Sequence, residues 1–324
     1  GEVSLNSDTD GNFDGRVAIT STITTAAGNI IIGGGADPAT TPVVTALSNT
    51  AVDLTGSLVT TTGNVSILAG DGSATGTTGF NIDSGGSITT TDGNVDITGI
   101  GSSSATSNKG IRLQGASTIQ STGNGAITLN GTGGSGSSDF QYGVIVGGGS
   151  DMSVNTGDLT VTGTATGGNS NGVRLADTTV GRLLSTGSGN ITVTGTGNGS
   201  FQGIETLNAA NLIGGPTATG SISQIADEIN IISGTIQSSG DLTIKPLNDS
   251  TPIGIGGPVA TLELGDTELS NLADGFNSIT IGSAATGIVN VGNSTFLDPI
   301  TIIGSEINDA ATGTDITAPA VTLG

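Results

Sequence analysis

The segment Gly189-Asn190-Ile191-Thr192-Val193 decides the fold, because close variants of it recur along the chain. Each copy has a glycine, then usually Asn or Asp, then two apolar residues separated by one other residue. The copies begin at Gly28, Gly63, Gly93, Gly125, Gly157, Gly189 and Gly240. Up to Ile191, the first apolar residue recurs after 35, 30, 32, 32 and 32 residues. The next step, to Leu242, is 51 residues, and Ile229-Asn230-Ile231 lies within it. This spacing indicates a repeat protein.

Two further short segments follow the same period. The second segment has a glycine followed by an alternating apolar pair, and its copies start at Phe80, Ile111, Val144, Val173 and Ile204. Examples of the third segment are Ser87-Ile88-Thr89, Thr118-Ile119-Gln120 and Ser153-Val154-Asn155. Alternation with period two, rich in Val, Ile and Thr, favours strands over helices. Each repeat therefore predicts three short strands joined by glycine-rich corners.

A unit of this size cannot bury its apolar side chains alone, and stacking of copies solves that problem. We predict an all-β fold, a parallel β-helix (β-solenoid) of about ten coils of roughly 31 residues, with three short strands in each coil. Residues 1–246 are expected to form the regular β-helix. Residues 247–324 are expected to continue it less regularly, with one short helix over residues 267–274. We also expect the chain to be a window of a longer polypeptide.

The residue after the repeat glycine is expected to form a column at one corner of the coils. Asn and Asp tolerate turn conformations, and stacked Asn side chains can form a hydrogen-bonded ladder. The alternative is that the column is a track for a ligand. Its members are Asn29, Asn64, Asn94, Asp158, Asn190 and Asp241.

Composition excludes several classes of protein. The 324 residues include 58 glycines, no Cys and no His, and the formal net charge is −21. Disulfide scaffolds, thiolate zinc sites and catalytic pairs that use Cys or His are therefore excluded. Nucleic acid is an unfavourable partner, because the chain has only six Lys and Arg residues against 27 Asp and Glu residues and its net negative charge repels phosphate groups. No apolar run is long enough to predict a membrane-spanning helix.

One acidic segment is similar to a calcium-binding loop. Asp10-Gly11-Asn12-Phe13-Asp14-Gly15, with Asp8 before it, matches the start of an EF-hand loop, but the position of the bidentate Glu is Ser21. Calcium is the one cofactor that the sequence suggests, and a solvated acidic turn is the alternative. The candidate ligands are Asp8, Asp10, Asn12 and Asp14.

Other polar residues carry weaker hypotheses. A polysaccharide-degrading enzyme would need a pair of carboxylates, for which Asp227-Glu228 and Asp266 with Glu268 are the acidic clusters. Arg112 and Arg174, with Lys109 nearby, are either a cationic pair as in lyases or solvated outward positions. Regular outward Thr residues would suit ice binding, but we expect Thr to alternate with Ser, Asn and Asp between coils. We expect no enzymatic activity.

Three stretches carry a resemblance to a known family. They are Asp8-Thr9-Asp10-Gly11 through Gly28-Asn29-Ile30-Ile31-Ile32-Gly33-Gly34-Gly35, Gly240–Pro246 with Ile253–Gly257, and Leu272–Gly282. Together with the repeats, the chain resembles the large filamentous-haemagglutinin-like, β-strand-repeat surface proteins of bacteria, which are common in cyanobacteria. The resemblance implies a right-handed parallel β-helix, export across the outer membrane, and a role as an adhesin or extracellular filament.

These observations predict a structural extracellular protein at the cell surface. We expect a β-helical subunit or segment of a filament, sheath or adhesin stalk that associates with itself head to tail. The alternative is an adhesin module that binds surface glycans or calcium on a lateral face, with a groove near the loops Gly133–Phe140 and Gly195–Phe201. A polysaccharide-degrading enzyme is the third reading.

Overall fold

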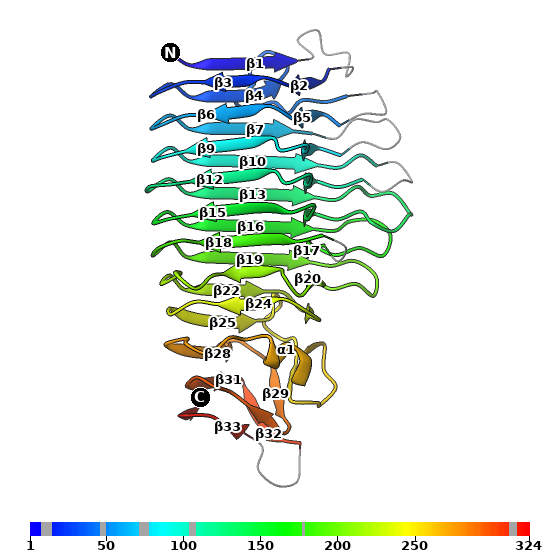
Figure 1. The fold of residues 1–324 in the computed structure, drawn as a ribbon. Helices are drawn as coiled ribbons and strands as arrows, with labels where there is room; N and C mark the ends of the chain where they lie inside the picture. Colours follow the sequence, from blue (N-terminus) through cyan, green and yellow to red (C-terminus); the bar gives the residue numbers. More distant parts are fainter. Residues whose placement is uncertain (8–14, 46–49, 71–77, 104–107, 177–178, 311–315) are drawn as a thin grey trace.

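A computed structural model describes residues 1–7, 15–45, 50–70, 78–103, 108–176, 179–310 and 316–324. The fold is a parallel β-helix whose coils stack along one axis, with the two ends of the chain at opposite ends of the stack (Figure 1). Three parallel sheets run along this stack, and the sequence prediction of the fold class is confirmed.

The longest sheet, called the first sheet here, has 12 strands in the described part of the chain. In spatial order they are β1 (Val3–Ser7), β4 (Ile30–Gly34), β7 (Val65–Ala69), β10 (Val95–Ile100), β13 (Ile127–Thr132), β16 (Leu159–Thr164), β19 (Ile191–Thr196), β22 (Ile222–Ile225), β25 (Asp241–Lys245), β28 (Ser278–Gly282), β31 (Ile300–Ile303) and β34 (Val321–Leu323).

The second and third sheets have eight described strands each. The second sheet contains β2 (Val17–Ile19), β5 (Val52–Leu54), β8 (Phe80–Ile82), β11 (Ile111–Leu113), β14 (Val144–Val146), β17 (Val173–Leu175), β20 (Ile204–Thr206) and β23 (Ile229–Ile231). The third sheet contains β3 (Thr22–Thr24), β6 (Ser57–Val59), β9 (Ser87–Thr90), β12 (Thr118–Ser121), β15 (Ser150–Val154), β18 (Gly181–Ser185), β21 (Leu212–Gly214) and β24 (Thr235–Gln237). From β2 to β25 each coil adds one strand to each sheet, as the repeat predicts.

Strand register confirms most of the predicted equivalences and corrects two. Ile191 pairs with Ile222, and Ile222 pairs with Leu242, so the long step in the repeat covers two coils. Ile229–Ile231, which lies in the same gap, is a strand of the second sheet. In the third sheet, Ile119 pairs with Met152 and not with Val154. The side chains of Met152 and Val154 are both fully buried, so the alternation of apolar residues alone could not show which of them pairs with Ile119.

The predicted corner column is a hydrogen-bonded ladder. The side-chain carbonyl of Asn29 accepts from the backbone N–H of Asn64 at 3.0 Å, and Asn64 accepts in the same way from Asn94 at 2.9 Å. Asp158 plays the same part, because it accepts from the N–H of Asn190 at 3.0 Å, whereas Asp241 accepts from the side chains of Asn277 and Ser278. The side chains of Asn29, Asn64 and Asp158 satisfy backbone donors of the following coil, and this agrees with the turn-forming reading.

A column of glycines brings the first and second sheets close together. Gly99, Gly131, Gly163 and Gly195 pair in register on neighbouring strands of the first sheet. A Cβ added at any of them would lie closer than 3.0 Å to the carbonyl oxygen of a glycine just before a strand of the second sheet. The corner between these sheets therefore has room for backbone only. The facing glycines are Gly110, Gly143, Gly172 and Gly203.

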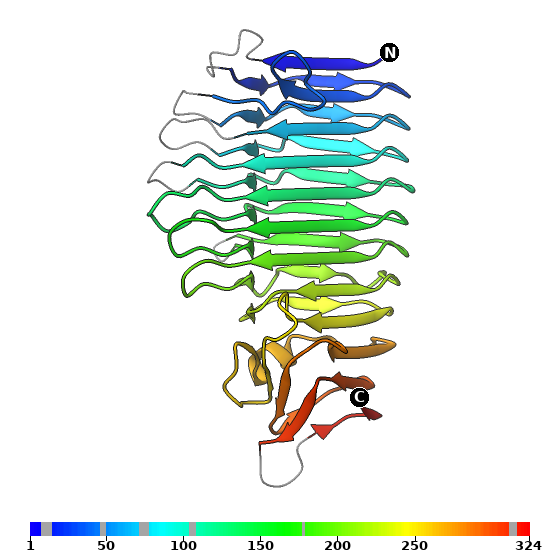
Figure 2. The same cartoon turned by 180° about the vertical axis from the view of Figure 1, so that it is seen from behind.

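The regular stacking changes after β25, where the second and third sheets have ended (Figure 2). A four-stranded sheet forms instead from β27 (Leu262–Leu264), β26 (Ile253–Ile255), β29 (Ile288–Val291) and β32 (Glu306–Asp309), and β30 (Ser294–Thr295) pairs with β33 (Ile316–Thr317).

The predicted helix is present but shorter than expected. α1 spans Asp266–Ser270, and Leu272 already returns to a parallel bridge with Ile236. Glu268 Oε2 accepts from the N–H of Gly265 at 3.1 Å and so closes the first turn. Within the described ranges no helix has the length and apolar character to cross a membrane.

Candidate ligand-binding groove

A groove of about 790 Å³ lies on the outer face of the second sheet. Three of the six basic residues of the chain line it, together with its single Tyr and one exposed Phe. The lining residues that carry its chemistry are Asp83, Lys109, Arg112, Phe140, Tyr142 and Arg174.

The β-helix itself brings the cations together. Arg112 is the central residue of β11 and Arg174 is the central residue of β17, and both pair in register with Ile145 of β14. Their backbones are therefore two coils apart, with a rise of about 4.8 Å for each coil. Lys109 and Tyr142 occupy equivalent positions, directly before the glycines that precede β11 and β14. The structure thus places Lys109, Arg112 and Arg174, singled out in the sequence, around one groove.

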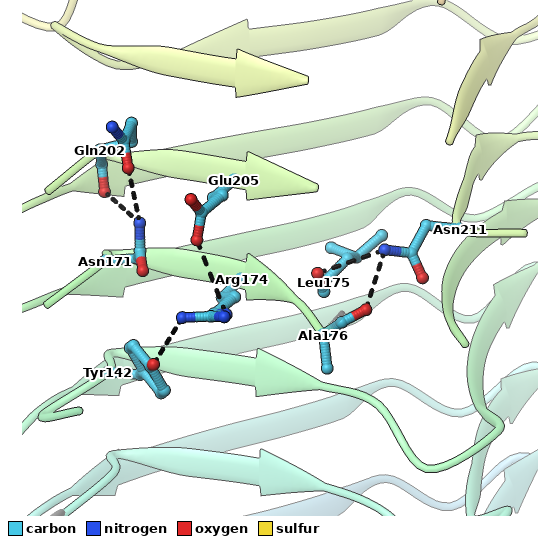
Figure 3. A network of polar contacts seen from close by, with 8 residues as sticks. All are labelled: Tyr142, Asn171, Arg174, Leu175, Ala176, Gln202, Glu205 and Asn211. Atoms are coloured by element: carbon cyan, nitrogen blue, oxygen red, sulfur yellow. Dashed lines mark hydrogen bonds and ion pairs between the residues drawn. The ribbon is translucent and has the colours of Figure 1, made fainter. Parts of the chain in front are cut away.

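Arg174 is held by neighbouring side chains (Figure 3). Its Nη1 donates to the Tyr142 hydroxyl at 2.6 Å, and its Nε lies 3.6 Å from Oε2 of Glu205. The guanidinium also lies 5.1 Å from the centre of the Tyr142 ring. Asn171 donates to Gln202 of the next coil, which ties the two coils beside this pair together. Arg174 therefore acts as a support that fixes Tyr142.

Arg112 has a different environment. Its Nε is buried and has no hydrogen-bond partner within the part of the chain that the structure describes. Burial lowers the pKa of Arg112, while the charges of Asp83 and Asp53 act in the opposite direction. Both carboxylates are bonded elsewhere, because Asp83 accepts from Gln114 at 2.5 Å and Asp53 accepts from Arg16 at 2.9 Å. Arg112 is thus a partly buried cation, and the two carboxylates whose charges act on it accept hydrogen bonds from other donors.

Lys109 offers a test of this electrostatic environment. Burial and, to a smaller degree, the charge of Arg112 together lower the pKa of Lys109 to about 8. The rate of acylation of Lys109 by a small reagent is therefore expected to rise with pH with a midpoint near 8. In Arg112→Gln the midpoint moves upward, because loss of a like charge favours the protonated amine.

Peptide mass spectrometry after brief labelling measures this midpoint. Arg182→Gln is the matched control, because Arg182 is paired with Asp151 on the third sheet at 2.6 Å. An unchanged midpoint in Arg112→Gln would contradict the proximity of the two cations.

Phe140 is the exposed aromatic residue of the groove. Its side chain is 51 % exposed, and its backbone has a φ of 71°, a conformation that bulky residues rarely adopt. Its ring meets the ring of Tyr142 edge to face, with centroids 6.0 Å apart. A groove was predicted near Gly133–Phe140 and Gly195–Phe201, and of these two loops only Phe140 is among the lining residues. Tyr142 was not predicted as a site residue, although a lone Tyr two residues after a Phe was a visible signal.

The other sites suggested by the sequence are separated or lie elsewhere. Asp8, Asp10, Asn12 and Asp14 lie outside the described residues. Within the described ranges, no group of three or more acidic side chains could hold a metal ion. The calcium hypothesis for the first acidic segment stays a prediction.

The fold separates Asp227 from Glu228 and brings Glu228 close to Glu268 of the other acidic cluster. Glu228 and Glu268 line a separate cavity of about 190 Å³ together with Glu263. Burial raises the pKa of Glu268, and the charge of Glu263 raises it further. Asp227 instead accepts hydrogen bonds from the backbone N–H of Asn248 and from the hydroxyl of Thr251. One residue of each predicted acidic cluster, Glu228 and Glu268, therefore lines the same small cavity.

Outward threonines are more regular than expected on three strands. Across β13, β16 and β19, Thr128 pairs with Thr160 and then with Thr192, and Thr132, Thr164 and Thr196 form a second row. The expected variation between Thr and other polar residues is therefore wrong for these rows. It holds on the preceding strands, where Ser66 and Asp96 occupy the first row.

Comparisons with known proteins found no relative. No family model matches this chain, and no curated protein or solved structure matches it either. The resemblance to filamentous-haemagglutinin-like surface proteins stays a prediction.

Proposed function

We propose that the chain is a structural segment of an extracellular filament, sheath or adhesin stalk at the cell surface, and that copies associate head to tail. The stacked parallel architecture supports this role, because each coil of a solenoid is stabilised mainly by its two neighbours and length is added without a new core. The absence of Cys and the net charge of −21 suit exposure to an oxidising exterior.

The observation that carries the proposal is that each of the two outermost strands of the first sheet has one edge without a partner strand among the described residues. Among the described residues, β1 pairs only with β4, and β34 pairs only with β31. The N–H of Val3 donates to the carbonyl of Asn29 at 2.8 Å, so the intervening groups of Ser4 and Asn6 point to the other edge. Val321 and Leu323 are 44 % and 58 % exposed at the opposite end. Strand edges of this kind pair readily with a further strand, whether it belongs to a second copy or to a neighbouring coil of a longer polypeptide.

Pairing of one end with the opposite end of another copy would be heterologous. Such a contact repeats without closing and produces filaments. Electron microscopy and sedimentation velocity of the full chain test this directly, and we expect fibres or long rods whose abundance rises with protein concentration. The double variant Ser4→Pro/Asn6→Pro removes two outward N–H donors without removing the bonds to β4, so it is expected to remain as short single rods.

Ser4→Ala/Asn6→Ala is the matched control and keeps the donors, so it should assemble like the unmodified chain. Single short rods of the unmodified chain at the highest concentrations would overturn head-to-tail association. The same samples with a calcium chelator test the acidic segment, since fibres that disappear on chelation would make bound calcium part of the contact.

A further inference from the structure

We propose that the groove on the second sheet binds an acidic carbohydrate, with a sugar carboxylate held by Arg112 and the sugar ring packed on Phe140. This goes beyond the structural role and does not depend on head-to-tail association. It assigns a ligand class to a lateral surface between the two ends of the β-helix.

Charge distribution argues for an anionic ligand. In a chain with a net charge of −21, three of six basic residues line this one groove, and among the described lining residues Asp83 is the one carboxylate. That carboxylate accepts from Gln114 at 2.5 Å. A local cluster of cations is costly to maintain, because burial and mutual repulsion both disfavour the charged forms. An anion in the groove would relieve that cost.

Arg112 is the residue placed to bind the anion. Arg174 already contacts Glu205 and Tyr142, whereas Nε of Arg112 has no hydrogen-bond partner in the described structure. Because Nε is buried, the contact falls to the two terminal nitrogens of the planar guanidinium, whose parallel N–H donors match the two oxygens of a carboxylate. We therefore assign Arg112 the carboxylate contact, with Lys109 as the second cation in the groove.

Phe140 argues for a carbohydrate rather than a small inorganic anion. The φ of 71° at Phe140 is a strained backbone conformation for a bulky residue, and such strain persists where the surrounding structure imposes it. About half of the surface of Phe140 is exposed to water. Tyr142 is only 4 % exposed and braces the Phe140 ring from one side. The exposed face of Phe140 is then an apolar platform for the C–H face of a sugar ring next to the cations.

The groove also has space for an extended ligand. Its volume is about 790 Å³, and part of its lining is formed by Gly115, Gly147 and Gly148, which carry no side chains. The lining residues come from successive coils, so the groove crosses the strands of the second sheet. A linear oligosaccharide with regularly spaced carboxylates fits this arrangement.

Isothermal titration calorimetry of the full chain tests the proposal with three probes. These are trigalacturonate, its fully methyl-esterified form, and a sulfated oligosaccharide without carboxylates. We expect trigalacturonate to bind, with an affinity that falls as salt is added, and the neutral ester not to bind. Arg112→Gln and Phe140→Ser should each weaken binding roughly tenfold or more, the change expected when a charge-assisted hydrogen bond or an aromatic contact is lost.

Arg182→Gln is the matched control, because it removes the same charge from a pair with Asp151 outside the groove. It should leave the affinity for trigalacturonate unchanged. Equal binding of the ester, equal binding by Arg112→Gln, or no binding of trigalacturonate would overturn the proposal. Equal binding of the sulfated probe would overturn the assignment of a carboxylate as the recognised group. Each variant is first compared with the unmodified chain by circular dichroism, so that loss of fold is not taken for loss of a contact.

Discussion

Replacement of Gly163 by valine is expected to lower the free energy of unfolding by about 3 kcal/mol. Gly163 is a buried residue of β16, and an added Cβ would lie closer than 3.0 Å to the carbonyl oxygen of Gly172. The backbone of Gly163 fixes the position of the Cβ, and the atom that it meets is a backbone oxygen, so no side-chain rotation relieves the contact. Gly163→Ala should show the same effect to a smaller degree, because it adds fewer atoms at the same place.

Thr162→Val is the matched control for this substitution. It introduces the same side chain at the adjacent outward position of β16, where the expected change is within about 0.5 kcal/mol. Urea denaturation followed by circular dichroism gives both free energies. Equal unfolding midpoints for the two valine variants would show that the first and second sheets do not approach as closely as the structure has them.

Replacement of Gln224 by methionine is expected to raise the free energy of unfolding by about 2 kcal/mol. Gln224 has no exposed surface, and neither its amide oxygen nor its amide nitrogen has a hydrogen-bond partner in the described structure. It pairs in register with Val193 and Ile244, so it interrupts a column of apolar side chains. Methionine keeps the unbranched shape and removes the cost of burying an unsatisfied amide.

The reciprocal substitution is the control. Leu129 lies in the same column, between Ile97 and Val161, and is fully buried. Leu129→Gln is expected to lose about 2 kcal/mol for the same reason that Gln224→Met gains it. A loss of stability in Gln224→Met would show instead that the amide is satisfied by internal water.

The local pattern was sufficient to predict the coil. The glycine, the turn-forming Asn or Asp and the alternating apolar pair recur with nearly constant spacing, and Ile127, Leu159 and Ile191 pair in the register that this spacing predicts. Prediction was less accurate where a coil changes length. The strand at Ile222 was not recognised, although it lies 31 residues after Ile191, because Gln224 stands where the neighbouring copies have their second apolar residue.

The candidate groove was only partly predictable. Arg112 and Arg174 stood out because they recur at equivalent positions of the second segment, and the parallel register turns that recurrence into proximity. Tyr142 did not stand out, because its role depends on Arg174 of the next coil, whose guanidinium donates to its hydroxyl. Phe140 was visible as the end of a loop, but its exposure and its left-handed backbone are properties of the folded chain.

Repeat length, alternation and corner residues, all readable in order along the chain, were enough to establish a parallel β-helix with an Asn ladder. These features are local, and stacking of like coils repeats each of them without long-range choices. The contacts across the coil were decided by the tertiary structure alone. Which glycine faces which carbonyl, and which acid pairs with which arginine, depend on distances between segments that the order of residues does not specify. The environment of Arg112, whose Nε has no hydrogen-bond partner among the described residues, is a consequence of those distances, since the two carboxylates whose charges act on it accept from other donors.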